Sequence, residues 1–246
     1  MKKKRAQTEK EKELDELSAI FEPTVESGGD LSGDYLTKLK EFNEKWEGID
    51  SEVVIPEKRV TDTITPNTIY SSTLGVSTYA QQTTYYCGPA SAYQLMKFKG
   101  ITSNPNDGRT LTQANLALDL GTTTGGTSFT GTWLSTLKNW TNRTFSATWS
   151  PSASTVYSRT YNNVNSNWPL IYDCHMSSSR GYLVGYTSGT IKHYVTGDGW
   201  QYNDSDPTFR QCHYVDPNQY KTAAYGPHWT SASNLSNLMQ DLGLLY

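Results

Sequence analysis

The chain of 246 residues divides into two parts of different composition, and no glutamate occurs after Glu57. Residues 1–60 hold 11 of the 21 Lys and Arg residues and 15 of the 24 Asp and Glu residues. Every carboxylate side chain beyond that point is an aspartate, so no glutamate there can serve as an acid, a base or a metal ligand. We therefore expect a charged helical N-terminal arm over residues 1–60 and a folded domain over residues 61–246.

The second part of the chain is nearly neutral, with 10 basic and 9 acidic residues. Binding to nucleic acid depends largely on neutralising phosphates, so this balance argues against a nucleic-acid partner. No run approaches the roughly 18–20 apolar residues that a membrane-spanning helix needs, and we expect no membrane span.

The opening MKKKR resembles the charged start of a signal peptide, but AQTEKEKELDEL follows instead of an apolar run. The body is rich in Thr, Ser, Asn, Gly and Tyr and poor in Lys and Glu, a composition typical of exported bacterial proteins. We therefore expect a secreted or cell-surface bacterial protein whose signal peptide is absent from this chain.

Two helical patterns occur in the arm, on either side of SGGDLSGD at 27–34. Apolar residues recur at spacings of three in EKEKELDELSAI at 9–20, and they share one helical face in DYLTKLKEFNEKWEGI at 34–49. The arm is interpreted either as a packing element or as a propeptide or spacer, and both interpretations stay open.

After an extended connector at 53–65, the hydrophobic pattern indicates helices first and strands second. The predicted helices cover 88–99, 111–121 and 130–140, with a closing helix at 234–246. The predicted strands cover 168–176, 191–200 and 211–220. Helices followed by strands indicate an α+β domain.

Cys87 stands out chemically because it lies just before the predicted helix, in QQTTYYCGPASAY. Unpaired N–H groups and the positive end of a helix dipole stabilise a thiolate at that place, and the thiolate is the nucleophilic form. Gly88 leaves room near the sulfur, and Pro89 costs no hydrogen bond in the first turn. Six residues upstream, Gln81 has a side-chain amide that can donate to a developing oxyanion.

These residues resemble a known family. Gln-(five residues)-Cys-Gly-Pro-Ala, a helix, and then strands bearing His-Tyr-Val and Val-Asp-Pro are similar to the bacteriocin-processing, double-glycine-leader cysteine peptidases and their stand-alone relatives, within the papain-like superfamily. The resemblance covers about residues 78–220. It implies a papain-like α+β fold, with a helical half carrying the cysteine and a small antiparallel sheet carrying a histidine and an aspartate.

Carried over residue by residue, the resemblance implies that Cys87 is the nucleophile and Gln81 the oxyanion donor. It implies that His193 is the base and that Asp216 orients it. A second glutamine, Gln82, leaves the oxyanion assignment open by one position. Members that process bacteriocins are usually fused to a membrane transporter, which has no counterpart here, so the leader-peptide substrate does not carry over.

The four histidines are not equivalent candidates for the base. His193 and His213 both precede Tyr-Val. His213 and Asp216 are three apart on one predicted strand, so their side chains point to opposite faces, whereas His193 can meet Asp216 from the neighbouring strand. We therefore favour His193 as base over His213, with Asn218 as a poorer alternative to the orienting aspartate. His175 and His228 are interpreted as structural.

The three cysteines, Cys87, Cys174 and Cys212, are too few for a disulfide scaffold. A disulfide between Cys174 and Cys212 and two buried thiols both remain open. Cys-His pairs occur at 174–175 and 212–213, but adjacent strand residues face opposite ways and cannot readily bind one metal. We expect no cofactor and no metal site.

The resulting functional hypothesis is a cysteine peptidase that hydrolyses an amide bond of a peptide or protein substrate. One alternative is a catalytically inactive papain-like module for binding or adhesion. Another is a cell-wall peptide amidase or transferase that keeps the same residues. The oligomeric state does not follow from the sequence.

Overall fold

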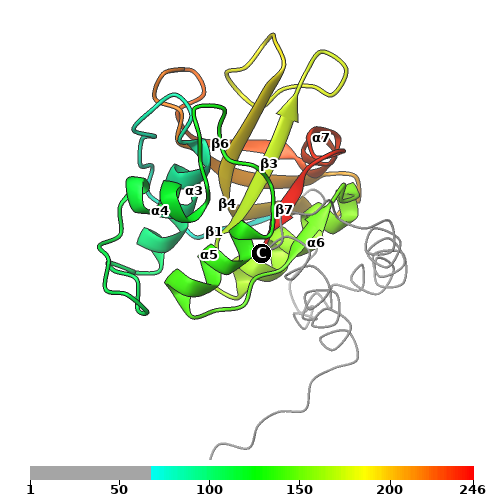
Figure 1. Ribbon diagram of the computed structural model, residues 1–246. Helices are drawn as coiled ribbons and strands as arrows, with labels where there is room; N and C mark the ends of the chain where they lie inside the picture. Colours follow the sequence, from blue (N-terminus) through cyan, green and yellow to red (C-terminus); the bar gives the residue numbers. More distant parts are fainter. Residues whose placement is uncertain (1–67) are drawn as a thin grey trace, which may run out of the picture.

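A computed structural model describes residues 68–246 of the chain (Figure 1). The predicted arm over 1–60, with its two helices, and the connector at 53–65 lie outside the described residues. Within residues 68–246 the fold is mixed α/β, with seven antiparallel strands in one sheet and five helices. No helix of this part is both long enough and apolar enough to cross a membrane.

The helices are α3 (Cys87–Phe98), α4 (Gln113–Asp119), α5 (Thr132–Thr141), α6 (Ala153–Asn165) and α7 (Ala232–Leu238). The strands are β1 (Ile69–Thr73), β2 (Ala147–Trp149), β3 (Leu170–Met176), β4 (Ile191–Asn203), β5 (Arg210–Asp216), β6 (Gly226–Ser231) and β7 (Gly243–Leu245). The three helices and three strands predicted between 88 and 220 all occur, with boundaries that differ by a few residues.

Strand β4 organises the sheet, whose order is β2-β7-β3-β4-β5-β6. The first half of β4 pairs with β3, and its second half pairs with β1 on the same edge, while β5 occupies the other edge. The pairing with β5 shifts in register between Gly197 and Gly199. A Cβ atom at Gly197 would lie 2.5 Å from the ring of Tyr172, which explains why a glycine stands where the neighbouring strand packs so closely.

The sheet separates two hydrophobic clusters, with α3, α4 and α5 on one side and α6 and α7 on the other (Figure 1). Alternation along β3 sends Ile171 into the first cluster and Tyr172 into the second. Helix α3 is also fixed to β4 by buried polar contacts, because the Thr196 hydroxyl lies 2.7 Å from Oε1 of Gln94 and 3.1 Å from the carbonyl oxygen of Ser91. The middle of α3 is thus held against the central part of β4.

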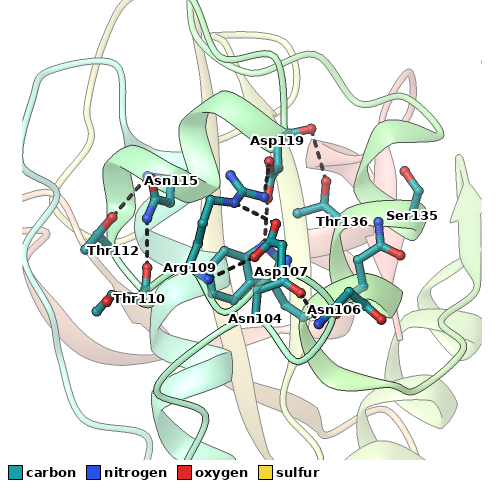
Figure 2. A network of polar contacts seen from close by, with 12 residues as sticks. Asn104, Asn106, Asp107, Arg109, Thr110, Thr112, Asn115, Asp119, Ser135 and Thr136 are labelled. Carbon is teal, nitrogen blue, oxygen red and sulfur yellow. Dashed lines mark hydrogen bonds and ion pairs between the residues drawn. The ribbon is translucent and has the colours of Figure 1, made fainter.

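The segment between α3 and α4 is anchored by a polar network around Asp119 (Figure 2). Arg109 donates to both carboxylate oxygens of Asp119 at 2.9 Å and to Asp107 at 2.7 Å. Trp140 of α5 donates its indole N–H to Asp119 at 2.7 Å, and Thr136 donates to the carbonyl oxygen of the same residue at 3.1 Å. These contacts tie α4, α5 and the loop that precedes α4 into one helical half.

The closing helix expected over 234–246 is wrong in its second half. Helix α7 ends at Leu238, and residues 243–245 form strand β7 between β2 and β3. A Cβ atom at Gly243 would lie 2.1 Å from the carbonyl oxygen of Thr148, so this position requires glycine for the close pairing with β2. Long-range pairing therefore overrides the local helical pattern.

Candidate active site

Cys87 is the first residue of α3, and its side chain is buried. No side chain caps this helix, and no acidic residue lies in its first turn. The N–H groups of the first turn thus have no side-chain acceptor, an environment that favours a negative charge on the sulfur. A Cβ atom at Gly88 would lie 2.6 Å from Oγ1 of Thr127 and 3.2 Å from the Trp133 ring, so glycine is needed beside the cysteine.

His193 is buried on β4 and forms hydrogen bonds with two of the predicted site residues. Its Nε2 atom lies 2.8 Å from Oδ1 of Asp216, and the side chain also hydrogen-bonds to Cys87. Because Nε2 is engaged by Asp216, the ring nitrogen left for Cys87 is Nδ1. Burial lowers the pKa of His193, but the charge and hydrogen bond of Asp216, together with Cys87, outweigh it and raise the pKa to about 10.

Asp216 ends β5 and is fully buried. Besides His193, it accepts a hydrogen bond from the Tyr186 hydroxyl at 3.2 Å and from the backbone N–H of Asn218 at 2.8 Å. The Asn218 side chain in turn donates to the Tyr186 hydroxyl at 2.9 Å. Asn218, the alternative orienter from the sequence, thus supports Asp216 instead of replacing it. Tyr186 carries no sequence signal, because it lies in the loop before β4.

Gln81 is buried, whereas Gln82 is exposed, so the two glutamines have different environments. The backbone N–H of Gln81 donates to the carbonyl oxygen of Pro217, and its carbonyl oxygen accepts from the Gln219 side chain, both at 2.8 Å. Its side-chain Nε2 donates to the carbonyl oxygen of Thr83 at 2.8 Å, and Oε1 is buried without a hydrogen-bond partner. Gln81 is thereby attached to the segment that follows Asp216.

The remaining histidines are engaged elsewhere. Nδ1 of His213 lies 2.5 Å from Oδ1 of Asp198, and Oδ2 of Asp198 accepts a hydrogen bond from the backbone N–H of Val76. Nδ1 of His175 lies 2.8 Å from Oδ2 of Asp241, and Nε2 of His228 lies 2.7 Å from the carbonyl oxygen of Ala224. As the strand geometry predicted, His193 meets Asp216 and His213 does not.

Cys174 and Cys212 are buried free thiols, so the disulfide left open by the sequence does not form. They lie on β3 and β5, on opposite edges of β4. Two strand spacings are roughly 9–10 Å, beyond the roughly 7 Å that a disulfide tolerates between Cα atoms. Within residues 68–246, His, Cys, Asp and Glu side chains form no group of three or more that could hold a metal ion.

Comparisons with known proteins were made for the whole sequence and for the fold. A protein of Bacillus anthracis whose crystal structure is described as C39-like matches with a TM-score of 0.43 and 12% identity, over 72% of this chain and 96% of that one. A comparison with curated proteins finds no match. The model of the Peptidase C39-like family matches residues 73–237, more than half of the sequence, and this chain belongs to that family.

Proposed function

We propose that this protein is a cysteine peptidase of papain-like layout, in which Cys87, His193 and Asp216 act together on a peptide amide bond. The observation that carries the proposal is that His193 forms two hydrogen bonds. Its Nε2 atom bonds to Asp216, and its side chain also bonds to Cys87. A histidine placed between a carboxylate and a thiol at a helix N-terminus has the geometry of an acid–base partner for that thiol.

In the proposed reaction, the Cys87 thiolate attacks the carbonyl carbon of the scissile peptide. The new oxyanion accepts hydrogen bonds from the backbone N–H of Cys87 and from the side-chain amide of Gln81. Protonated His193 then donates its proton to the leaving amine, and the C–N bond breaks. Water, deprotonated by His193, hydrolyses the thioester and releases the acid.

Asp216 supports this cycle in two ways. Its hydrogen bond to Nε2 fixes the ring orientation of His193 and leaves Nδ1 for the sulfur. Its charge holds the proton on His193 at neutral pH, where the pKa of the histidine stands at about 10. In this proposal His193 therefore rests as the imidazolium beside Cys87.

Gln81 contributes the second donor of the proposed oxyanion site. One N–H of its amide is used by Thr83, and an amide nitrogen carries two. Burial of Gln81 and exposure of Gln82 support the choice between them.

Alkylation with iodoacetamide, followed by peptide mapping, tests the proposal. Cys87 should react faster than a model thiol at neutral pH. Cys174 and Cys212 serve as internal controls, since burial raises the pKa of both thiols, that of Cys212 to about 12. Equal and slow labelling of all three cysteines would count against a nucleophilic Cys87, and Cys87→Ala should abolish hydrolysis while leaving the fold intact.

A further inference from the structure

Asp173 is a buried carboxyl group beside the candidate active site for which the proposed reaction has no use. It lies on β3, and 2% of its surface is exposed. It pairs with Tyr194 of β4, and the neighbouring residue Cys174 pairs with His193. Its Oδ1 atom is buried and has no hydrogen-bond partner within residues 68–246. Burying an ionised carboxylate with an unpaired oxygen costs free energy, so we look for a protonated form or a functional role of this group.

Tyr194 connects Asp173 with the surroundings of Cys87. Trp133 donates its indole N–H to the Tyr194 hydroxyl at 3.2 Å, and Trp133 is also the ring that packs against Gly88. The Tyr194 hydroxyl also shares a hydrogen bond with the Asp173 side chain. Burial raises the pKa of Tyr194, and the charges of Asp173 and Cys87 raise it further, which requires both groups to be near.

The proton of the Tyr194 hydroxyl has two orientations, because this group has one donor and two acceptor positions. One acceptor position is taken by Trp133. An ionised Asp173 would attract the hydroxyl proton to itself. A protonated Asp173 instead donates to the second acceptor position, and the hydroxyl proton is then free to point away from β3.

We propose that Asp173 is a positioning residue which, as a neutral acid, directs the Tyr194 hydroxyl proton toward the Cys87 side of the site. This inference rests on the proposed function, because it assigns the hydroxyl the task of stabilising negative charge near the sulfur. Ionisation of Asp173 reverses the effect by capturing the proton and adding a negative charge nearby.

The groups facing Asp173 support its neutral form. Burial raises the pKa of Asp173 to about 8, although the Tyr194 hydrogen bond and the charges of Lys192 and His193 act to lower it. The nearby Asp241 adds to the increase. Asp173 should hence be protonated at neutral pH and ionise under mildly alkaline conditions.

A first experiment follows the carboxyl ¹³C signals of Asp and the ring ¹³Cζ signals of Tyr by NMR from about pH 6 to about pH 10, a range that brackets the titrating groups. The Asp173 and Tyr194 signals should move together with a midpoint near 8. In Asp173→Asn, whose amide still donates to the hydroxyl, the Tyr194 signal should lose the transition with a midpoint near 8. A Tyr194 signal that ignores the ionisation of Asp173 would overturn the inference.

A second experiment measures the alkylation rate of Cys87 over the same pH range. Wild type should lose reactivity relative to Asp173→Asn as pH rises through about 8, and Tyr194→Phe should reduce this difference to the part that the Asp173 charge causes directly. Asp241→Asn is the matched control, since it should lower the midpoint slightly and keep the inflection. Identical profiles for wild type and Asp173→Asn would overturn the inference. Slow labelling of Cys87 in every variant would overturn the proposed function instead, and the NMR titration decides on Asp173 in that case.

Discussion

His193 and Asp216, on adjacent strands, are joined by a 2.8 Å hydrogen bond that is buried from solvent. A second pair of the same type, His213 with Asp198, lies nearby on the same two strands. Only the first pair also engages Cys87. The two pairs can therefore be compared directly. We propose that His193 and Asp216 take part in the reaction and that His213 and Asp198 stabilise the fold.

Replacing the two aspartates should separate these roles. Asp216→Ala should reduce acylation by an activated ester by roughly 10³-fold or more, because His193 loses its orientation and its charge partner. Asp216→Asn should retain more activity than Asp216→Ala, since the amide oxygen still accepts the imidazole N–H. Asp198→Ala should lower stability and leave acylation unchanged. Burst kinetics and thermal unfolding check both, and equal losses at the two sites would contradict the distinction.

Stability should fall with rising pH because of His193. Its pKa rises from 6.5 in the unfolded chain to about 10 in the folded protein, so folding favours the protonated form. This contribution is complete below about pH 6.5 and is lost as pH rises through about 10. Unfolding midpoints measured across this window should decrease. His193→Gln should show a flatter profile, and an unchanged slope in that variant would exclude His193 as the cause.

The two neighbouring glutamines provide a matched pair of variants. Gln81→Ala should slow acylation by roughly 10²-fold, in the range found for loss of one oxyanion donor. Gln82→Ala should behave like wild type, because that side chain is exposed. The alkylation rate of Cys87 should be the same in both, since alkylation forms no oxyanion. A defect of equal size in Gln82→Ala would contradict the assignment.

Gly88→Ala should destabilise the protein although alanine favours a helix. The propensity gain of about 1 kcal/mol is opposed by overlap with Thr127 and Trp133, and overpacking costs about 1–3 kcal/mol. Adding Thr127→Ala should recover part of the loss by removing the hydroxyl that lies closest to the new methyl group. Denaturant unfolding of the single and double variants measures this coupling, and strictly additive effects would argue against the overlap.

Tyr186→Phe should weaken the support of Asp216. The change removes one of the three hydrogen bonds to the carboxylate and leaves the Asn218 side chain without its acceptor. We expect a loss of about 1 kcal/mol of stability and a shift in the pH dependence of Cys87 alkylation. A variant that loses stability while its pH profile stays unchanged would show that Tyr186 serves packing alone.

Local patterns in the sequence predicted α3, and the family resemblance together with strand geometry predicted the His193–Asp216 pairing. Pro89 and Gly100 bracket the helix, and strand alternation favours His193 over His213 as the partner of Asp216. Strand β7 and helix α6 were not predicted, because β7 depends on pairing with distant β2 and β3, and the many Asn and Ser residues of α6 weaken its helical pattern. Tyr186 and Asp173 could not be assigned from sequence, since their importance comes from contacts made across the fold.

The attachment of Gln81 to Gln219 spans 138 positions of the chain. Contacts of such separation form only after most of the polypeptide exists, because a long loop must close first. During synthesis, Cys87 leaves the ribosome more than a hundred residues before His193 and Asp216. The growing chain thus contains a thiol without its acid–base partner, and on the proposed mechanism amide cleavage begins only after β4 and β5 have joined the sheet.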